Sequence, residues 1–301
     1  MKIPTNCHGG ILGAFDYRLD KGSLTAKVYY SNYSSIYRQE REYQSDMKDS
    51  STYGYNRSRT KNEIQDIGVN LSYDSEFSKL YRLRAGLGYV SHNYLPEGLL
   101  NQSASKDNIF DENNNDPHIR ANEGFAYVDN TFNFFDVVAV NLGLRGLLSN
   151  IRDHTFNMLE PRASLRCMIG EKYSVKLWYA RMSQFVQQIS SNYINLPTDL
   201  WQPITPRFKP LLSDQYSVGL YGTLPHYMYF SVEGWCKNMK NLLEYREGVS
   251  VLNPGLAWEE KLTSGKGWSY GIDLSMTKEA GAFTGTVGYG LMWNWRKFEE
   301  L

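Results

Sequence analysis

Apolar and polar residues alternate with a period of two along most of this chain. Across residues 81–89 every odd position is apolar or aromatic and every even position is Arg or Gly, and across 159–167 the odd positions are again apolar. Such alternation is typical of β-strands with one apolar and one polar face, because successive side chains point to opposite faces. The pattern predicts twelve strands, over residues 11–20, 23–33, 62–75, 81–93, 121–134, 138–149, 155–168, 173–185, 211–224, 227–244, 266–279 and 283–296.

The predicted strands are long, and their connections are sorted by length. Globular strands usually have about five or six residues, whereas about ten residues let a tilted strand cross a bilayer. Tight turns such as Lys21-Gly22 alternate with long polar segments, so all the short turns should lie at one end of the sheet. This sorting is typical of bacterial outer-membrane barrels. The long segments are 34–61, 94–120, 186–210 and 245–265, and only 150–154 is short where a long loop is expected.

The free-energy cost of placing a charged side chain in lipid predicts which face of the sheet contacts the membrane. An Arg at the bilayer midplane costs about 2–4 kcal/mol, so we expect the apolar positions to face lipid and the charged positions to face the concave side. The expected lipid-facing residues are Leu83, Leu87, Val140, Leu142, Val175, Leu177, Ile272 and Leu274. The expected concave-side residues are Arg82, Arg84, Arg162, Arg166, Lys176 and Asp273.

Composition narrows the class of protein. The 301 residues carry a formal net charge of zero, which argues against a nucleic-acid partner because phosphate binding requires a basic surface. The 23 Tyr and 7 Trp suit a membrane–water interface, where one end of the ring is apolar and the other is wet. No run approaches the roughly 20 apolar residues of a membrane-spanning helix. The N-terminus also lacks the apolar stretch of a signal peptide.

Motifs for catalysis or metal binding are weak. Residues 267–271 match the nucleophile elbow of hydrolases, but they precede a predicted strand and no His follows Ser269. Residues 111–118 begin like a calcium loop, yet Asp116 stands where glycine is expected. The five His and three Cys show no metal-ligand or disulfide spacing. We therefore expect no enzyme activity, no metal site and no cofactor.

Charged residues on the predicted concave face allow two interpretations. Glu160, Arg162 and Arg166, together with Arg82 and Arg84, could form an ion-pair ladder along the wall or a steering surface for an anionic ligand. The ladder is favoured, because such ladders are the commoner arrangement on a polar barrel wall.

Loop 186–210 contains the candidate ligand-binding residues. Its four prolines restrict the backbone, so the loop should be ordered. We expect Tyr193, Asp199 and Trp201 to line the outer vestibule, where rings stack on a solute and Asp accepts hydrogen bonds. That chemistry suits sugars, peptides or iron chelates equally. The alternative, which is the commoner use of such a loop, is inward folding that packs the barrel mouth.

Several segments carry a resemblance to a known family. Residues 159–166, 179–191, 196–221, 238–248 and 265–274 resemble the barrel of TonB-dependent outer-membrane receptors of the Bacteroidota type. The resemblance is good over residues 121–301 and holds only in pattern over the first third of the chain. Its most specific part is the Leu-Pro-Thr-Asp-Leu-Trp segment that leads into Ser-Asp-Gln-Tyr.

The resemblance implies a fold, a location and a function. The fold is all-β, a transmembrane antiparallel β-barrel with up-and-down meander topology and roughly 22 strands, closed around an N-terminal plug domain. The function is TonB-dependent uptake of a nutrient such as an oligosaccharide, peptide or iron chelate across the cell outer membrane. The implied partners are outer-membrane lipid, TonB through the plug, the nutrient and a surface lipoprotein, with no nucleic acid.

The chain departs from that pattern in extent. We expect residues 1–301 to form a partial barrel domain, with the plug, signal peptide and C-terminal strands absent. Such a fragment should be an open sheet of about twelve strands that is not competent for transport alone. Two alternatives remain open. A complete small outer-membrane barrel (a pore, an autotransporter-like barrel or a lipase) would pair residues 11–20 with 283–296, and a soluble all-β binding protein would cover the apolar face with a second sheet.

Overall fold

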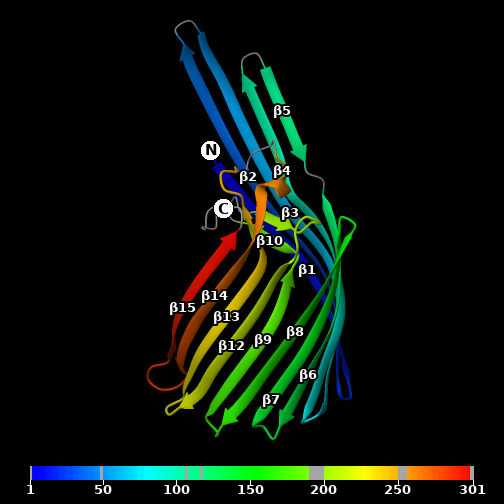
Figure 1. Cartoon of the computed structure of the whole chain (residues 1–301), viewed down its shortest axis with the longest axis vertical. Coiled ribbons are helices and arrows are strands. Elements are labelled where there is room, and N and C mark those ends of the chain that lie inside the picture. The colour runs from blue at the N-terminus through cyan, green and yellow to red at the C-terminus, as the bar shows by residue number, and fades with distance from the viewer. Residues whose placement is uncertain are drawn as a thin grey trace.

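The computed structural model describes residues 2–47, 50–105, 108–115, 118–189, 200–249 and 256–298. Within these residues the chain is almost entirely β-structure (Figure 1). The strands of the first half are β1 Lys2–Leu19, β2 Gly22–Met47, β3 Ser50–Ser78, β4 Tyr81–Ser105, β5 Asn108–Asn115, β6 Ile119–Phe134 and β7 Val138–Ile151. Those of the second half are β8 His154–Ile169, β9 Tyr173–Gln184, β10 Val186–Ile189, β11 Leu200–Pro203, β12 Leu211–Leu224, β13 Met228–Tyr245, β14 Leu262–Lys278 and β15 Gly285–Phe298.

Thirteen of these strands form one curved antiparallel sheet: β5 pairs only with β4, and the other twelve follow a single path. Their order is β1-β2-β3-β4-β6-β7-β8-β9-β12-β13-β14-β15, a meander in which each strand pairs with the next along the path. Over the described residues β1 and β15 do not pair, so the sheet is open (Figure 1). The predicted fold class, the twelve strands and the unpaired first and last strands are confirmed. The small closed barrel is not what these residues form.

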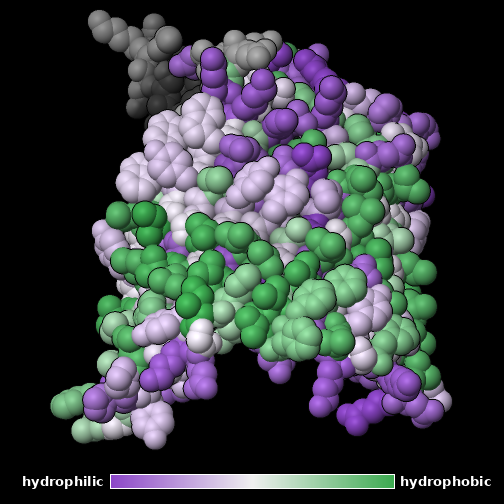
Figure 2. Space-filling view, turned by 60° about the horizontal axis from the view of Figure 1, so that its bottom comes forward, coloured by the Kyte–Doolittle hydropathy of each residue, from purple (hydrophilic) through white to green (hydrophobic). Residues whose placement is uncertain are grey.

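The strand register places charged and apolar side chains on opposite faces. Directly opposed residues on neighbouring strands share a face. Arg84 lies opposite Asp129, Asp129 lies opposite Gly143, and Gly143 lies opposite Arg162, so both arginines are on the same face. Leu177 opposes Val218 on the other face, and the same register holds for the remaining residues of both predicted sets. Figure 2 shows the outer face, where hydrophobic side chains form a belt between hydrophilic regions. The predicted sidedness is confirmed, and the belt is the surface expected to meet lipid.

The connections at one end of the sheet are short. The turns β1–β2, β3–β4, β6–β7, β8–β9, β12–β13 and β14–β15 all lie at the lower end in Figure 1. At the opposite end, β7 and β8 are joined by the two residues Arg152 and Asp153, both with positive φ (47° and 62°). Two positive φ values give a turn whose twist matches that of the strands. The predicted asymmetry of the connections and its exception at 150–154 are therefore present.

Two predicted long loops are instead strands. β2 and β3 continue as a paired ladder as far as Met47 and Ser50, and β4 continues and pairs with β5 over residues 98–115. The prediction of loops at 34–61 and 94–120 was wrong because these segments form hairpins that project beyond the other strands of the sheet (Figure 1). A strand with water on both faces needs no apolar side, so the alternation disappears while the hydrogen-bonded ladder persists.

Within the described ranges, helical structure is confined to one short 3₁₀ helix. The 3₁₀ helix η1, Trp258–Lys261, lies in the β13–β14 connection and buries Trp258 and Lys261. No helix in the described part of the chain is long and apolar enough to span a membrane.

Candidate functional site

The long-connection end of the sheet is filled by chain that folds inward. β10 and β11 pair as a short antiparallel hairpin, with Gln187 opposite Gln202 and Gln188 opposite Trp201. This hairpin and the segment that follows it, called here the mouth hairpin (residues 186–189 and 200–208), pack against the polar face of the large sheet. That face is therefore the concave one. The inward packing weighed as the alternative for loop 186–210 is what the described residues show.

A hydrophobic cluster holds the mouth hairpin in place. Ile204 from the hairpin and Ile151 from β7 are both 0% exposed. Burial of an aliphatic side chain of this size contributes about 1.5–3 kcal/mol, so the cluster gives the mouth a core of its own. Its buried members come from the wall, the hairpin and the β13–β14 connection: Tyr94, Ile119, Ala121, Leu147, Ile151, Phe185, Ile189, Ile204, Phe208, Leu243, Tyr245, Trp258 and Leu262.

Asn62 ties the mouth hairpin to strands β3 and β4. A register shift between Lys61 and Glu63 leaves Asn62 outside the β3–β4 ladder, beside Pro96, which has no N–H to donate. The Asn62 side chain is fully buried. Its Nδ2 donates to the carbonyls of Pro96 (2.8 Å) and Trp201 (2.9 Å), and its Oδ1 accepts the Trp201 N–H (3.2 Å). The Asn62 side-chain amide therefore hydrogen-bonds to backbone groups of β4 on one side and of β11 on the other.

Gln187 makes the corresponding tie to β13. Asn241 forms a bulge there, with φ of 62° and a register shift between Lys240 and Leu242. The buried Gln187 side chain donates from Nε2 to the Asn241 carbonyl (3.1 Å) and accepts the Leu243 N–H at Oε1 (3.2 Å). The mouth hairpin is therefore bound to β3–β4 on one side and to β13 on the other.

The structure describes one of the three predicted ligand-binding residues. Trp201 lies on β11, with its backbone held by Asn62 and its side chain half-buried. Tyr193 and Asp199 lie outside the described residues, so their place in the vestibule stays a prediction. Sequence reasoning missed Asn62 and Gln187, because each acts on backbone far away along the chain. The available signal was Pro96 inside a strand-like run, since proline in a strand marks an edge or a bulge.

Below the mouth, the concave wall carries ion pairs. Asp74 accepts bonds from Arg82 (2.8 and 2.6 Å) and from Arg84 (3.0 Å). Arg162 lies 3.8 Å from Asp129. Glu160 lies 3.7 Å from Arg145 and accepts a bond from the Ser183 hydroxyl at 2.6 Å. The predicted ladder is confirmed for Arg82, Arg84, Glu160 and Arg162. Among the described residues Arg166 has no carboxylate partner within 4 Å, so it is not part of the ladder.

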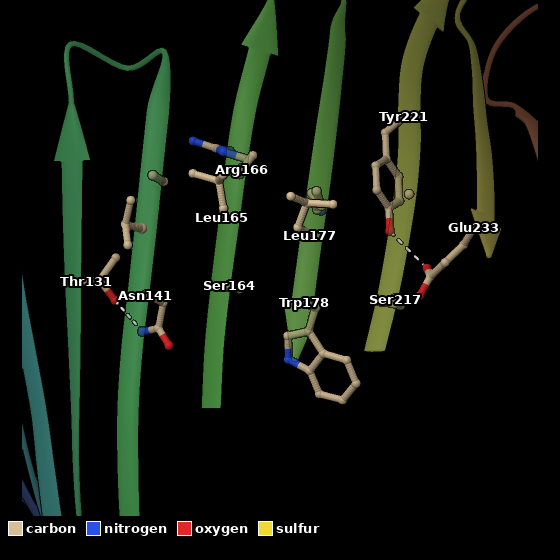
Figure 3. Close-up of a pocket in the computed structure, with 14 residues that line it drawn as sticks. Thr131, Asn141, Ser164, Leu165, Arg166, Leu177, Trp178, Ser217, Tyr221 and Glu233 are labelled. Atoms are coloured by element: carbon tan, nitrogen blue, oxygen red, sulfur yellow. Dashed lines mark hydrogen bonds between the residues drawn. The ribbon is translucent and has the colours of Figure 1, made fainter. Parts of the chain in front are cut away.

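Arg166 instead faces a groove in the concave wall. The groove holds about 550 Å³ and crosses strands β6 to β13 (Figure 3). Beside Arg166 lies Lys176, whose Nζ sits 4.2 Å from the centroid of the Tyr221 ring. The Tyr221 hydroxyl donates to Glu233 at 3.0 Å (Figure 3). The groove thus offers two cations, an aromatic ring and a carboxylate on a rigid wall.

Tyr94 belongs to the hydrophobic cluster at the mouth. Burial raises the pKa of the Tyr94 phenol, so this side chain stays neutral and serves as part of the cluster. No three His, Cys, Asp or Glu side chains in the described ranges are grouped closely enough to hold a metal ion.

Comparison with known proteins identifies a family whose sequence model matches most of this chain. The sequence model of the family described as "TonB dependent receptor-like, beta-barrel" matches residues 8–299. No curated protein matches the chain in sequence.

Solved structures share the fold at low identity. The chain is similar to the copper transporter OprC (13% identity, TM-score 0.62), with 97% of this chain and 46% of that chain covered. It is similar to the RagAB peptide transporter (10%, 0.61), with 100% and 38% covered. It is also similar to the FrpB iron transporter of Neisseria meningitidis (11%, 0.56), with 97% and 52% covered. The chain therefore spans about half the length of these structures or less.

Proposed function

The chain belongs to the family of TonB-dependent receptor β-barrels, and on this premise we propose that it forms part of the barrel wall of an outer-membrane receptor that imports a nutrient. The receptor lies in the outer membrane with the mouth hairpin facing outward. The role is transport rather than catalysis.

One observation carries the proposal: the sheet has an apolar outer belt and a polar concave face, and the described residues that fold inward lie at the mouth end. Along β12, Val218 on the outer face is 51% exposed, whereas its neighbour Ser217 lines the groove on the concave face. An apolar belt of this kind is stable only against lipid. Short periplasmic turns and elaborated outer connections then fix which end meets the cell exterior.

The concave face would receive a plug in the full-length receptor. The family has a plug domain inside the barrel, and the groove of Arg166, Lys176, Tyr221 and Glu233 offers it a polar surface to contact. TonB would act through that plug, so energy reaches the mouth from the inner membrane. The uptake is thus expected to require the proton-motive force.

The nutrient is proposed to be a polar organic solute: an oligosaccharide, a peptide or an iron chelate. Trp201, with Tyr193 and Asp199 in the same loop, would supply stacking and hydrogen bonding at the vestibule. A surface lipoprotein is a proposed partner that would hold the nutrient above the mouth. The similar structures transport copper, peptide and iron by their names, so they agree on transport and differ in cargo.

The test is a deletion of the gene for the full-length protein in its native host. Uptake of labelled peptide mixtures, oligosaccharide mixtures and ferric chelates is measured with and without a protonophore. We expect the deletion and the protonophore each to abolish uptake of one of the three classes. Unchanged uptake of all three, or absence of the protein from the outer-membrane fraction, would refute the proposal.

A further inference from the structure

Three lysines form a row on the outer face of the sheet. Lys240 on β13 lies directly opposite Lys266 on β14, and Lys266 lies directly opposite Lys297 on β15. All three side chains are exposed. Neighbouring strands lie about 5 Å apart, so the three cations occupy adjacent positions on a surface of fixed spacing.

The position of the three lysines relative to the membrane interface follows from the aromatic residues beside them. One step further into the apolar belt, Trp268 on β14 opposes Trp295 on β15, with ring centroids 6.4 Å apart. The next step is Tyr270 and Trp293, at 5.4 Å. Stacked Trp and Tyr rings on the outer face mark the level of the membrane interface. The lysines therefore lie just beyond the interface, at the mouth end, where lipid headgroups of the outer leaflet are found.

Nothing in the described chain neutralises this row. Like charges directly opposite each other on a sheet are destabilising, and none of the three lysines has a carboxylate within 4 Å among the described residues. Asp214 feels the charge of Lys240, but its two oxygens already accept bonds from Arg181 at 2.8 and 3.2 Å. Three aligned cations above an aromatic girdle, with no carboxylate partner within 4 Å in the described part of the chain, favour binding of an anion on this surface.

We propose that Lys240, Lys266 and Lys297 bind the phosphate groups of an anionic glycolipid in the outer leaflet. Each lysine would extend its aliphatic stem toward the Trp rings and place its ammonium group at the headgroup. The acyl chains would then lie along the apolar belt below. This proposal rests on the outer-membrane placement proposed above, because it needs a lipid leaflet at this height.

The experiment uses the full-length protein in phosphatidylcholine nanodiscs with added diphosphoryl lipid A. Lipid retained by the protein is quantified by native mass spectrometry for wild type and for the K240Q/K266Q/K297Q variant. The matched control is K21Q/K79Q/K172Q, which removes the same charge from exposed lysines at the short-turn end. Membrane-surface lysines contribute enough that we expect roughly a 100-fold loss of affinity for the row variant and none for the control.

Three further arms keep the result unambiguous. K240R/K266R/K297R should retain the lipid, and Lys266→Gln alone should weaken binding about fivefold, which tests the row should the triple variant fail to assemble. Dephosphorylated lipid A should bind weakly to all variants. Equal retention by wild type and the row variant, or full competition by inorganic phosphate at equal concentration, would overturn the proposal. Absence of the receptor from the outer membrane would refute the proposed function rather than the lipid site alone. Cell fractionation measures this separately.

Discussion

The side-chain amide of Asn62 pairs with both backbone groups of Trp201, a residue 139 positions further along the chain: Nδ2 donates to the Trp201 carbonyl at 2.9 Å and Oδ1 accepts its N–H at 3.2 Å. This contact gives the mouth hairpin one of its two fixed ends. It also makes the position of the Trp201 ring depend on a residue in a different part of the sheet.

Asn62→Ala should loosen the mouth hairpin. The change removes the Asn62 partner of both Trp201 backbone groups and leaves the Pro96 carbonyl only its bond from Gln202 (3.3 Å), and each unsatisfied buried group costs about 1–3 kcal/mol. We expect the free energy of unfolding to fall by about 3 kcal/mol, measured on the full-length protein by thermal unfolding in detergent. Asn150→Ala is the control, because Asn150 is exposed and bonds only Thr155. Equal loss in the two variants would contradict the role given to Asn62.

Gln187→Ala should act on the same element from the other side. The Asn241 carbonyl and the Leu243 N–H lose their partner, so this variant alone should also destabilise the protein by about 2 kcal/mol. If both amides hold one hairpin, the double variant with Asn62→Ala should cost less than the sum of the two. A double-variant cycle by thermal unfolding measures this, and strict additivity would mean that the two ties act independently.

Trp201→Ala tests the ligand-binding prediction. The anchoring hydrogen bonds use the backbone of Trp201, so removal of its ring should leave surface expression normal while uptake of the nutrient falls by about tenfold. That figure corresponds to about 1.4 kcal/mol, within the range of a lost aromatic contact. The control is Phe135→Ala, an 89% exposed ring at a short turn. Normal uptake at normal expression would remove Trp201 from the site, and lost expression would mean that its ring is structural.

Adjacent residues on β12 test the lipid face. Val218→Arg places a charge in the apolar belt and should destabilise the assembled protein by about 2–4 kcal/mol. Ser217→Arg places the same charge on the concave face, where the groove has room, and should be tolerated. The readout is the fraction of folded protein in the outer membrane, from its mobility before and after heating. A similar loss for both variants would argue against a lipid-facing belt.

The sequence was informative wherever lipid imposes a pattern. The membrane-crossing portions of the twelve strands follow from alternation, because every second side chain there faces the belt. The hairpins β2–β3 and β4–β5 were mistaken for loops because their projecting parts have no such face. Trp201 could be assigned to an ordered loop from the surrounding prolines. The ties through Asn62 and Gln187 could not be predicted, since a single amide in a polar run gives no local sign of a partner on another strand.

The mouth hairpin has a mechanical consequence. It is fastened to β3 through Asn62 and to β13 through Gln187, and six strands of the sheet lie between β3 and β13. Because the mouth hairpin is bonded at both ends, it fixes the distance between these two strands. The mouth end of the sheet therefore cannot widen while the side-chain amides of Asn62 and Gln187 stay bonded. A solute that enters must pass beside the mouth hairpin or detach one of its ends. In the second case, the mouth end of the sheet would widen after only a few hydrogen bonds had broken.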